Sequence, residues 1–517
     1  MNRETAQIFQ TNNASRWQRT KWGSRLVLFL LLIGATAFVI AYNYSANKPQ
    51  QLPVFQDEIK KKVLQPDKPT EPITKEYQGI RKFINDKWAK GLGCGQNNQV
   101  IDLSSSPYFN DSVGIRAAFY VNWDPQSLIS LQKNIDKINL VIPEWFFLDT
   151  KGDSLLLDID RNALGIMKAA GIKIMPLLTN NFQKTWHGDV VHRIINDPVK
   201  KSKLINDIIR VCKIYDLSGV NIDFEALIEA KNEVLTAFQK ELYEKMHAAG
   251  LMVSQDVSPF NEDYDQAALA NYNDYLFLMA YDEHSADSRP GPISSQRWVE
   301  KALDQVTKKI PPGKVVLCMA AFGYDWVNGG GSGSTTTLAY RDAITVARES
   351  EGQIRFDNDT YNLSYLYYDE INDLHEVHFT DAATNFNTLR FATEYQLAGT
   401  ALWRLGSEDL RLWQFYNKSM NKDALRQFDF SIFNKMAGSN NVDYIGSGDI
   451  MKVIAMPRSG HISIQIDSAA GLIAEETYDS LPSMFMVKQM GAPQGKTLVL
   501  TFDDGPDPKY TSKVLHI

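Results

Sequence analysis

The chain has 517 residues, of which 44% are hydrophobic and 22% charged, a balance typical of folded globular domains. Lys and Arg total 54 against 61 Asp and Glu, a formal net charge of −7, which disfavours a nucleic-acid partner because phosphates require a basic face. Three cysteines in a chain of this length exclude a disulfide scaffold. The length predicts three or four folded units, at roughly 150 residues per domain.

The N-terminal region predicts a membrane anchor. Residues 26–44 contain an uncharged apolar run that is long enough to span a bilayer as a helix. Four Lys or Arg residues between positions 16 and 25 stand immediately before this run, so the positive-inside rule places residues 1–25 in the cytoplasm. The alternative is a signal peptide cleaved near the small residues 35–37. Both interpretations place the rest of the chain outside the cytoplasmic (inner) membrane, and the anchor predicts a single-pass protein.

The next segments predict a spacer. Residues 45–74 hold five prolines among Gln, Lys and Asp, a composition typical of a stalk. Residues 75–112 predict a linker with one short helix, because apolar residues between Tyr77 and Trp88 lie near helical spacing.

Residues 113–418 alternate short apolar runs with amphipathic stretches, which predicts an α/β fold, a (β/α)8 TIM barrel. The stretch 323–382 is too long for one connection, so we expect a small inserted α+β subdomain there. The eight predicted strands are 115–123, 138–147, 172–179, 217–225, 250–257, 274–281, 314–322 and 397–404. A linker over 419–441, a small β module over 442–495 and a new segment over 496–517 follow.

The segment 218–225 holds the strongest chemical signal. On a strand, Asn221, Asp223 and Glu225 face one way and the apolar residues between them face the other. In a barrel the polar set points inward and ends at the carboxyl-terminal mouth, where such barrels place catalysis. Buried carboxylates are costly unless they share protons or perform chemistry. A buried polar network, or an Asp that caps the next helix, is the alternative interpretation of this stretch alone.

This segment resembles the strand-4 signature of glycoside hydrolase family 18, which reads Asp-Gly-x-x-Asp-x-Asp-x-Glu in its fuller form. Segments 279–282, 322–326 and 401–409 are similar to the motifs at strands 6, 7 and 8 of that family. The resemblance covers about residues 113–418. It is strongest with the branch that acts on bacterial envelope polymers, because residues 177–180 read Leu-Leu-Thr-Asn where many chitinases have Ser-x-Gly-Gly.

The resemblance implies retaining catalysis in which the substrate supplies its own nucleophile. Glu225 is implied to be the general acid and later to activate water. The N-acetyl oxygen of the sugar is the implied nucleophile, Asp223 holds the acetamide N–H, and Tyr281 hydrogen-bonds the acetamide oxygen. No cofactor is needed. The residues implied to bind substrate are Asn221, Asp282, Tyr324, Trp326 and Trp403, the last as an apolar floor.

The implied substrate is a β-linked polysaccharide that contains N-acetylglucosamine, and chitin-like, poly-N-acetylglucosamine and peptidoglycan-like polymers all remain open. Core packing of Tyr281 and Trp403 and a loop cap by Asp282 are the alternative roles. A glycan-binding module without catalysis is the alternative function. Ser218 and Asn221 replace two aspartates of the fuller signature. The loss of a charged neighbour at 221 predicts that Asp223 is ionised over a wider acidic range than in relatives with Asp there.

A second motif lies at residues 501–508, Thr-Phe-Asp-Asp-Gly-Pro-Asp-Pro. It resembles the first motif of polysaccharide deacetylases of the NodB type, carbohydrate esterase family 4. That likeness implies Asp503 as general base and Asp504 as ligand of a zinc-like divalent metal. The family completes this site with a His-x-x-x-His pair, whereas His516 is the one histidine after residue 508. We therefore expect no deacetylase activity from this chain. The resemblance extends to larger bacterial proteins that also carry a family 2 glycosyltransferase.

Overall fold

The computed structural model describes residues 114–516 apart from 152, 184, 229–232, 331–333, 439–441, 468–470 and 492–509. The expected cytoplasmic segment, membrane anchor, stalk and N-terminal linker lie outside the described residues. Among the helices that the structure describes, none is long and apolar enough to cross a membrane.

Eight parallel strands close into a barrel, in which each strand pairs with the next and the last pairs with the first. Every strand falls within a predicted range or within one residue of it, so the barrel predicted from the sequence is confirmed. The strands are β1 (Ile115–Tyr120), β2 (Leu140–Leu148), β5 (Leu177–Thr179), β8 (Gly219–Asp223), β9 (Met252–Val257), β10 (Tyr275–Met279), β11 (Val315–Ala320) and β17 (Gly399–Trp403). Short strands β3 (Leu155–Leu157) and β4 (Lys173–Ile174) extend the sheet beside β2.

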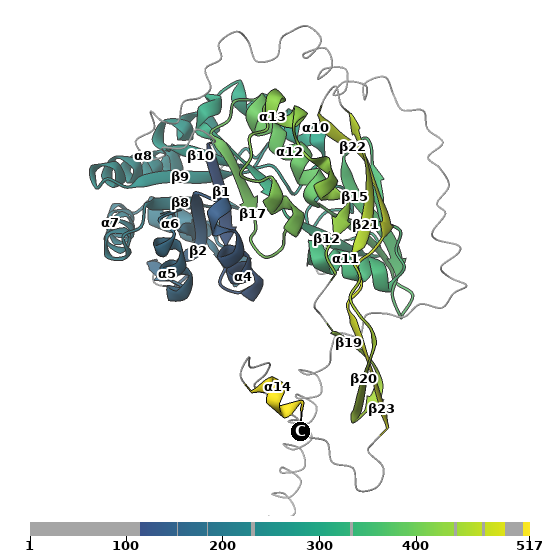
Figure 1. The fold of residues 1–517 in the computed structure, drawn as a ribbon. Coiled ribbons are helices and arrows are strands. Elements are labelled where there is room, and N and C mark those ends of the chain that lie inside the picture. Colours follow the sequence, from purple (N-terminus) through teal and green to yellow (C-terminus); the bar gives the residue numbers. More distant parts are fainter. Residues whose placement is uncertain are drawn as a thin grey trace, which may run out of the picture. The chain divides into compact units, whose positions relative to one another are not determined.

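Helices surround the barrel strands (Figure 1). They are α4 (Pro125–Asn134), α5 (Arg161–Ala169), α6 (Gly188–Ile195), α7 (Pro198–Tyr215), α8 (Glu233–Ala248), α9 (Gln266–Leu269), α10 (Gln296–Thr307) and α12 (Ala382–Glu394). The sequence determines where these helices begin. Asp197 caps α7 by accepting from the N–H groups of Val199 and Lys200, and Pro198 occupies the first turn. Asp381 forms a capping box with Thr384 at the start of α12.

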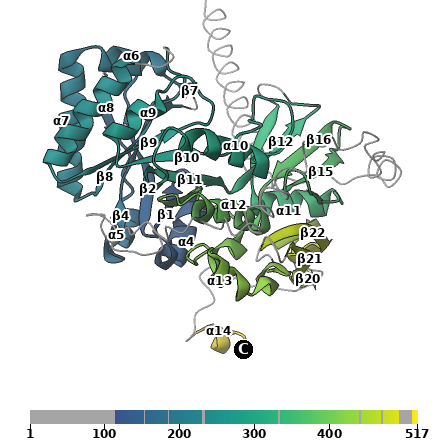
Figure 2. The same cartoon turned by 90° about the horizontal axis from the view of Figure 1, so that it is seen from above.

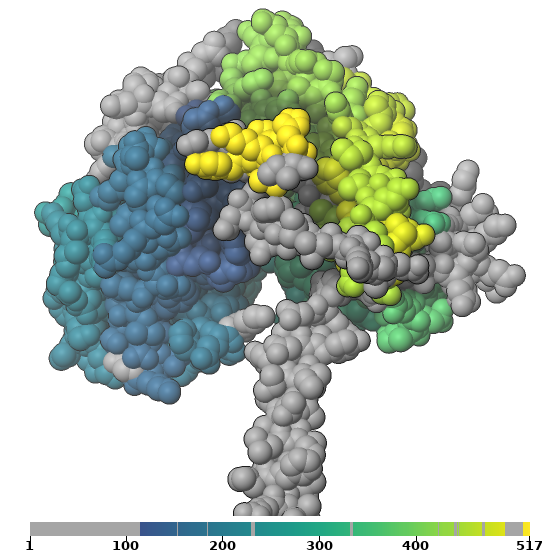
Figure 3. All heavy atoms as spheres, turned by 60° about the horizontal axis from the view of Figure 1, so that its bottom comes forward, coloured from purple at the N-terminus to yellow at the C-terminus, as the bar shows by residue number. Residues whose placement is uncertain are grey.

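The core has two layers, because strand side chains alternate between the helices and the barrel interior. Val220, Ile222 and Phe224 of the β8 segment pack in the outer layer under the helices. Phe119 and Phe277 belong to the inner cluster, which fills the barrel. The blue-to-teal surface in Figure 3 shows the first half of the barrel as one continuous mass.

The inserted subdomain lies between the seventh and eighth barrel strands, as predicted. Its antiparallel sheet has the order β13-β12-β16-β15-β14, and Figure 2 shows this sheet beside α10 and α11. Its elements are β12 (Phe322–Val327), β13 (Thr335–Ala339), α11 (Tyr340–Glu349), β14 (Arg355–Asp357), β15 (Asn362–Tyr368) and β16 (Leu374–Phe379).

The described residues after the barrel form two three-stranded sheets rather than one module. One consists of β18 (Lys435–Met436), β21 (Gly460–Asp467) and β22 (Leu472–Ser480), and the other of β19 (Val442–Gly448), β20 (Ile450–Ala455) and β23 (Phe485–Gly491). The remaining short elements are the hairpin β6 (Asn181–Phe182) and β7 (Thr185–Trp186), helices α13 (Lys422–Arg426) and α14 (Thr511–Val514), and the 3-10 turns η3 (Ile135–Lys137), η4 (Ala270–Tyr272), η5 (Pro312–Lys314), η6 (Leu410–Gln414) and η7 (Phe430–Phe433).

The stretch 419–441 was predicted as a linker, but its described part packs on the barrel. Phe428 and Phe433 lie against Phe386 of α12, with ring centroids 4.9 and 5.4 Å apart. Three aromatic residues within six positions supply enough apolar surface to hold this segment in place. The prediction is corrected on this point.

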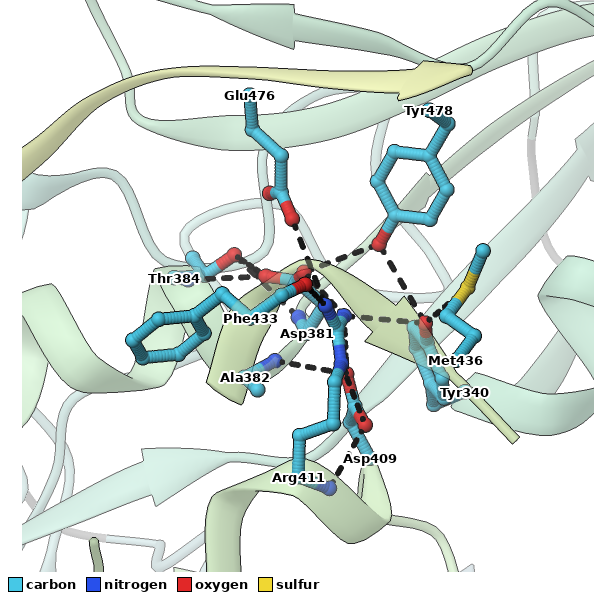
Figure 4. A network of polar contacts seen from close by, with 10 residues as sticks. All are labelled: Tyr340, Asp381, Ala382, Thr384, Asp409, Arg411, Phe433, Met436, Glu476 and Tyr478. Atoms are coloured by element: carbon cyan, nitrogen blue, oxygen red, sulfur yellow. Dashed lines mark hydrogen bonds and ion pairs between the residues drawn. The ribbon is translucent and has the colours of Figure 1, made fainter. Parts of the chain in front are cut away.

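Strand β22 also docks on the barrel domain, through buried polar contacts (Figure 4). Arg411 of η6 forms ion pairs with Asp409 at 2.6 Å and with Asp381 at 3.0 Å. Tyr478 of β22 donates a hydrogen bond to the same Asp381 at 2.9 Å. Glu476 of β22 lies 3.9 Å from Arg411. The first of the two small sheets is therefore joined to the barrel by a network that contains one cation and three carboxylates.

Candidate active site

Strand β8 carries Asn221 and Asp223 into the barrel interior, where both are buried. Glu225 follows two residues after Asp223, just beyond the strand, and is partly exposed. The apolar residues between them lie in the opposite layer of the core. The alternation predicted from the sequence is therefore present, and it directs two carboxylates to the carboxyl-terminal mouth of the barrel.

Asp223 has two acidic neighbours. Burial raises its pKa well above the usual value, and the charges of Glu225 and Asp256 raise it further, whereas a hydrogen bond from Thr179 acts in the opposite direction. The parallel register of β8 and β9 pairs Ile222 with Gln255, so Asp223 and Asp256 are the next residues along the two strands. Strand β9 therefore supplies Asp223 with an acidic neighbour other than position 221.

Asn180 holds the main chain of Glu225 in place. The Asn180 amide donates to the Glu225 carbonyl at 2.8 Å, and its oxygen accepts from the Glu225 N–H at 2.9 Å. Asn180 is itself 1% exposed and follows directly after strand β5. These two hydrogen bonds fix the main chain of Glu225 and do not involve its carboxyl group.

The Glu225 carboxyl is suited to proton transfer near neutral pH. Burial raises its pKa to about 7, the charge of Asp282 contributes in the same direction, and a hydrogen bond with Ser258 opposes them. The Ser258 hydroxyl lies 3.4 Å from Oε1 of Glu225. A general acid works best when its pKa lies near the working pH, and burial achieves that here.

Tyr281 and Asp282 follow strand β10 and reach the same mouth of the barrel. The Tyr281 ring lies edge-on to Phe322, with centroids 5.8 Å apart. Tyr324 donates a hydrogen bond to Oδ1 of Asp282 at 2.9 Å. Burial raises the pKa of Asp282 to about 6, although the Tyr324 hydrogen bond lowers it. The charge of Asp282 acts on Glu225, and the charges of Asp282 and Asp223 act on Tyr281, so these side chains share the mouth of the barrel.

The two tryptophans of the predicted site differ in position. Trp403 is the last residue of β17, is partly exposed, and packs edge-on against Phe119 with centroids 5.2 Å apart. Trp403 also packs against the inner cluster that contains Tyr281. Trp326 is 0% exposed and lies edge-on to Tyr324 at 5.3 Å. Trp326 therefore supports Tyr324 from behind and has no free face to offer a ligand, contrary to the prediction.

Asn221 also lies deeper than a substrate-binding residue would. It is 0% exposed, and its Oδ1 accepts a hydrogen bond from Ser254 at 2.6 Å. Its expected role in substrate contact is corrected to one of support below Asp223.

The sequence analysis missed an exposed aromatic residue. Trp123 follows β1 and is 63% exposed. Its Nε1 donates to Oε2 of Glu144 at 2.8 Å, and the Arg404 guanidinium lies 4.2 Å from the ring centroid. Its position at the end of the first predicted strand is a signal that could have identified it.

Asp256 and Asn180 were missed for a different reason. Each is contributed by a strand next to β8, and the pairing of strands is not visible in a linear sequence. The inward alternation of Ser254 and Asp256 within the predicted strand 250–257 was the available signal for Asp256.

Metal binding has no candidate among the described residues, in which no group of three or more His, Cys, Asp or Glu side chains could hold an ion. Asp503 and Asp504, the residues of the deacetylase-like motif, lie outside the described part of the chain.

Comparisons with known proteins identify a matching family model and several similar chains. Residues 170–409 match the family model of glycosyl hydrolases family 18. A Bacillus subtilis (strain 168) protein named "Uncharacterized glycosylase YvbX" is 25% identical over 310 residues, which cover 58% of this chain and 90% of that protein. The "Cortical fragment-lytic enzyme" of the same organism is 24% identical and matches 50% of this chain. The chain spans 63% of that enzyme, less than two thirds of its length.

A solved structure shares the fold. The chitinase from Chromobacterium violaceum ATCC 12472 has 25% sequence identity and a TM-score of 0.54, over 59% of this chain and 98% of that one. The closed barrel and its acidic mouth thus define the class as a glycosidase-type barrel. The match of residues 170–409 to the glycosyl hydrolases family 18 model agrees with the family that the sequence motifs resemble.

Proposed function

We propose that the chain is a membrane-anchored glycoside hydrolase that cleaves β-linked polysaccharides containing N-acetylglucosamine, with retention of configuration. The observation that carries this proposal is the pair Asp223 and Glu225 at the mouth of the barrel, in which burial raises the pKa of Glu225 to about 7. A buried carboxyl of this kind holds a proton that it can donate near neutral pH.

The proposed reaction has two displacements. In the first, Glu225 gives its proton to the glycosidic oxygen, the bond from that oxygen to the anomeric carbon breaks, and the substrate's acetamide oxygen bonds to the anomeric carbon. Asp223 accepts a hydrogen bond from the acetamide N–H and offsets the positive charge on the resulting oxazolinium ion. In the second, Glu225 takes a proton from water, the water oxygen bonds to the anomeric carbon, and the bond between that carbon and the acetamide oxygen breaks, which restores the neutral acetamide. Two inversions give retention.

The surrounding side chains orient the sugar. Tyr281 donates a hydrogen bond to the acetamide oxygen, and Asp282, held by Tyr324, accepts from sugar hydroxyls. Trp403 lies under the ring as an apolar floor. Trp123, with its exposed indole, offers a second flat surface for a neighbouring sugar. Trp326 and Asn221 act only by supporting these groups.

The substrate and location follow from the sequence and the relatives together. The similar proteins include a cortical fragment-lytic enzyme and a chitinase. Their names favour a polymer of the bacterial envelope or a chitin-like chain as the substrate. The charge pattern around residues 26–44 favours a single-pass inner-membrane protein with the barrel outside the cytoplasm. The glycosidase reaction itself requires no metal.

The test is product analysis after incubation of the full chain with chitin oligomers, poly-N-acetylglucosamine and peptidoglycan. We expect shortened products from at least one polymer, and none from the Glu225→Gln variant, which still binds the same polymer. A wild-type protein that binds these glycans and leaves every linkage intact is a glycan-binding module, and that result overturns the proposal.

A further inference from the structure

The site contains a buried carboxylate that the motif comparison does not assign. Asp256 of β9 is 3% exposed, and its Oδ1 has no hydrogen-bond partner among the described residues. A buried, unpartnered carboxylate oxygen is costly when it is charged. The cost is avoided when the group shares a proton with a second carboxyl nearby.

The second carboxyl is Asp223. The β8–β9 register ends with Ile222 beside Gln255, which makes Asp223 and Asp256 lateral neighbours on strands about 4.8 Å apart. Asn221 cannot fill this role. Its Oδ1 is already occupied by the Ser254 hydroxyl, and an amide does not take up a proton at ordinary pH.

We propose that Asp256 is a positioning residue of the hydrolase reaction, the proton-sharing partner of Asp223, and that it supplies from β9 the carboxylate missing at position 221 of β8. The inference rests on the proposed function. One proton is shared by the two carboxyls in the free protein. When the acetamide nitrogen becomes positive, the proton is held on Asp256 and Asp223 is anionic. The proton moves between two oxygens, and none enters or leaves the site.

The groups around the pair favour such sharing. The pKa of Asp256 is well above its usual value because of burial and then the charge of Glu225, while the Asn221 amide acts in the opposite direction. Glu225 and, more weakly, Glu144 also raise the pKa of Asp223. The other titratable side chains whose pKa responds to Asp256 are Tyr264, Tyr281 and Cys318. The charges that shift the pKa of either aspartate in the described part of the chain are all acidic, so nothing compensates two negative charges and one proton is retained.

A carboxylate exchange between the two strands tests the proposal. The single variant Asp256→Asn removes one of the two carboxyls that share the proton. The double variant, Asn221→Asp with Asp256→Asn, places a carboxyl on β8 in its stead. We expect Asp256→Asn to lower kcat by about 100-fold, the scale of a lost acid–base partner, with a much smaller change in KM. The double variant should recover most of that loss and the wild-type pH profile. A double variant that stays as slow as the single one, or a single variant with wild-type kcat and pH profile, overturns the proposal.

The pH dependence of unfolding provides a readout that does not require turnover. Carboxyls whose folded pKa is raised stabilise the fold below their unfolded pKa of about 4, and this contribution is lost as the pH rises towards the folded pKa. Asp256→Asn should therefore lose less stability than wild type as the pH rises above about 4. An equal loss of unfolding free energy in wild type and in Asp256→Asn overturns the proposal that the two aspartates share a proton. If wild type cleaves no polymer but the two proteins differ as expected here, the proposed function fails and the proton-sharing pair stands.

Discussion

In the described part of the chain, the buried carboxylates around Arg411 and those in the barrel mouth differ in what surrounds them. Around Arg411, a guanidinium lies between Asp381, Asp409 and Glu476, and backbone N–H groups at the ends of two helical segments donate to the two aspartates. In the barrel mouth, the charges that act on Asp223 are acidic.

The difference shows how one residue type serves two purposes. The Arg411 guanidinium and N–H donors satisfy Asp381 and Asp409, so this cluster joins β22 to the barrel, although burial raises the pKa of Glu476 there as well. Burial without a cation raises the pKa of each carboxyl, so the cleft holds protons that can be transferred. The surroundings, more than the residue type, separate the structural cluster from the candidate catalytic one.

The largest effect on activity should come from replacing Glu225, the candidate proton donor in the barrel mouth. Glu225→Gln removes the proton donor, and we expect kcat to fall by about 10²–10⁴-fold while glycan binding persists. Initial rates on the preferred polymer measure this. Glu241→Gln, at a surface ion pair on α8, is the matched control and should keep wild-type rates. Equal activity of the Glu225→Gln and Glu241→Gln variants would show that Glu225 is not the proton donor.

The structural cluster should respond in stability and not in chemistry. Arg411→Met leaves three buried carboxylates without their cation, which costs about 3–5 kcal/mol. Chemical denaturation measures the change. Arg210→Met, at an exposed pair with Asp207, should change stability by less than about 1 kcal/mol. If both variants unfold at the same denaturant concentration, the Arg411 network does not join β22 to the barrel as described.

A smaller effect on activity is expected from replacing Asn180, which hydrogen-bonds the main chain of Glu225. Asn180→Ala removes both hydrogen bonds to the Glu225 peptide. We expect a loss of about 1–3 kcal/mol in transition-state stabilisation, the cost of unpaired buried groups. The loss should appear in kcat rather than KM, with a broader or shifted pH profile. An unchanged kcat and pH profile would contradict the positioning role.

The smallest effect is a shift of the pH profile. Because Glu225 must be protonated, activity should fall as the pH rises through about 7. Asp282 raises that pKa through its charge, so Asp282→Asn should move this limb of the kcat/KM profile to lower pH. A limb that stays in place, or moves to higher pH, contradicts the electrostatic account.

The sequence predicted the barrel because each strand carries its own local signal of apolar alternation, and it predicted the inward direction of Asp223 and Glu225 for the same reason. It did not predict the burial of Trp326, which depends on the packing of the inserted sheet against the barrel. The alternation of strand 250–257 could have marked Asp256 as inward-facing, but its pairing with Asp223 could not be predicted because a linear sequence does not contain the register of neighbouring strands. The packing of the segment 419–441 on the barrel was not predicted, although Phe428, Phe430 and Phe433 indicated an apolar surface there.

The most direct test of the account is the anomeric form of the first product, followed by proton NMR during hydrolysis of a fully N-acetylated oligomer and of its deacetylated counterpart. The account predicts that the β-anomer appears first from the acetylated oligomer and that the deacetylated one is left uncut. An α-anomer as the first product, or equal cleavage of both oligomers, would show that the sugar's acetamide is not the nucleophile.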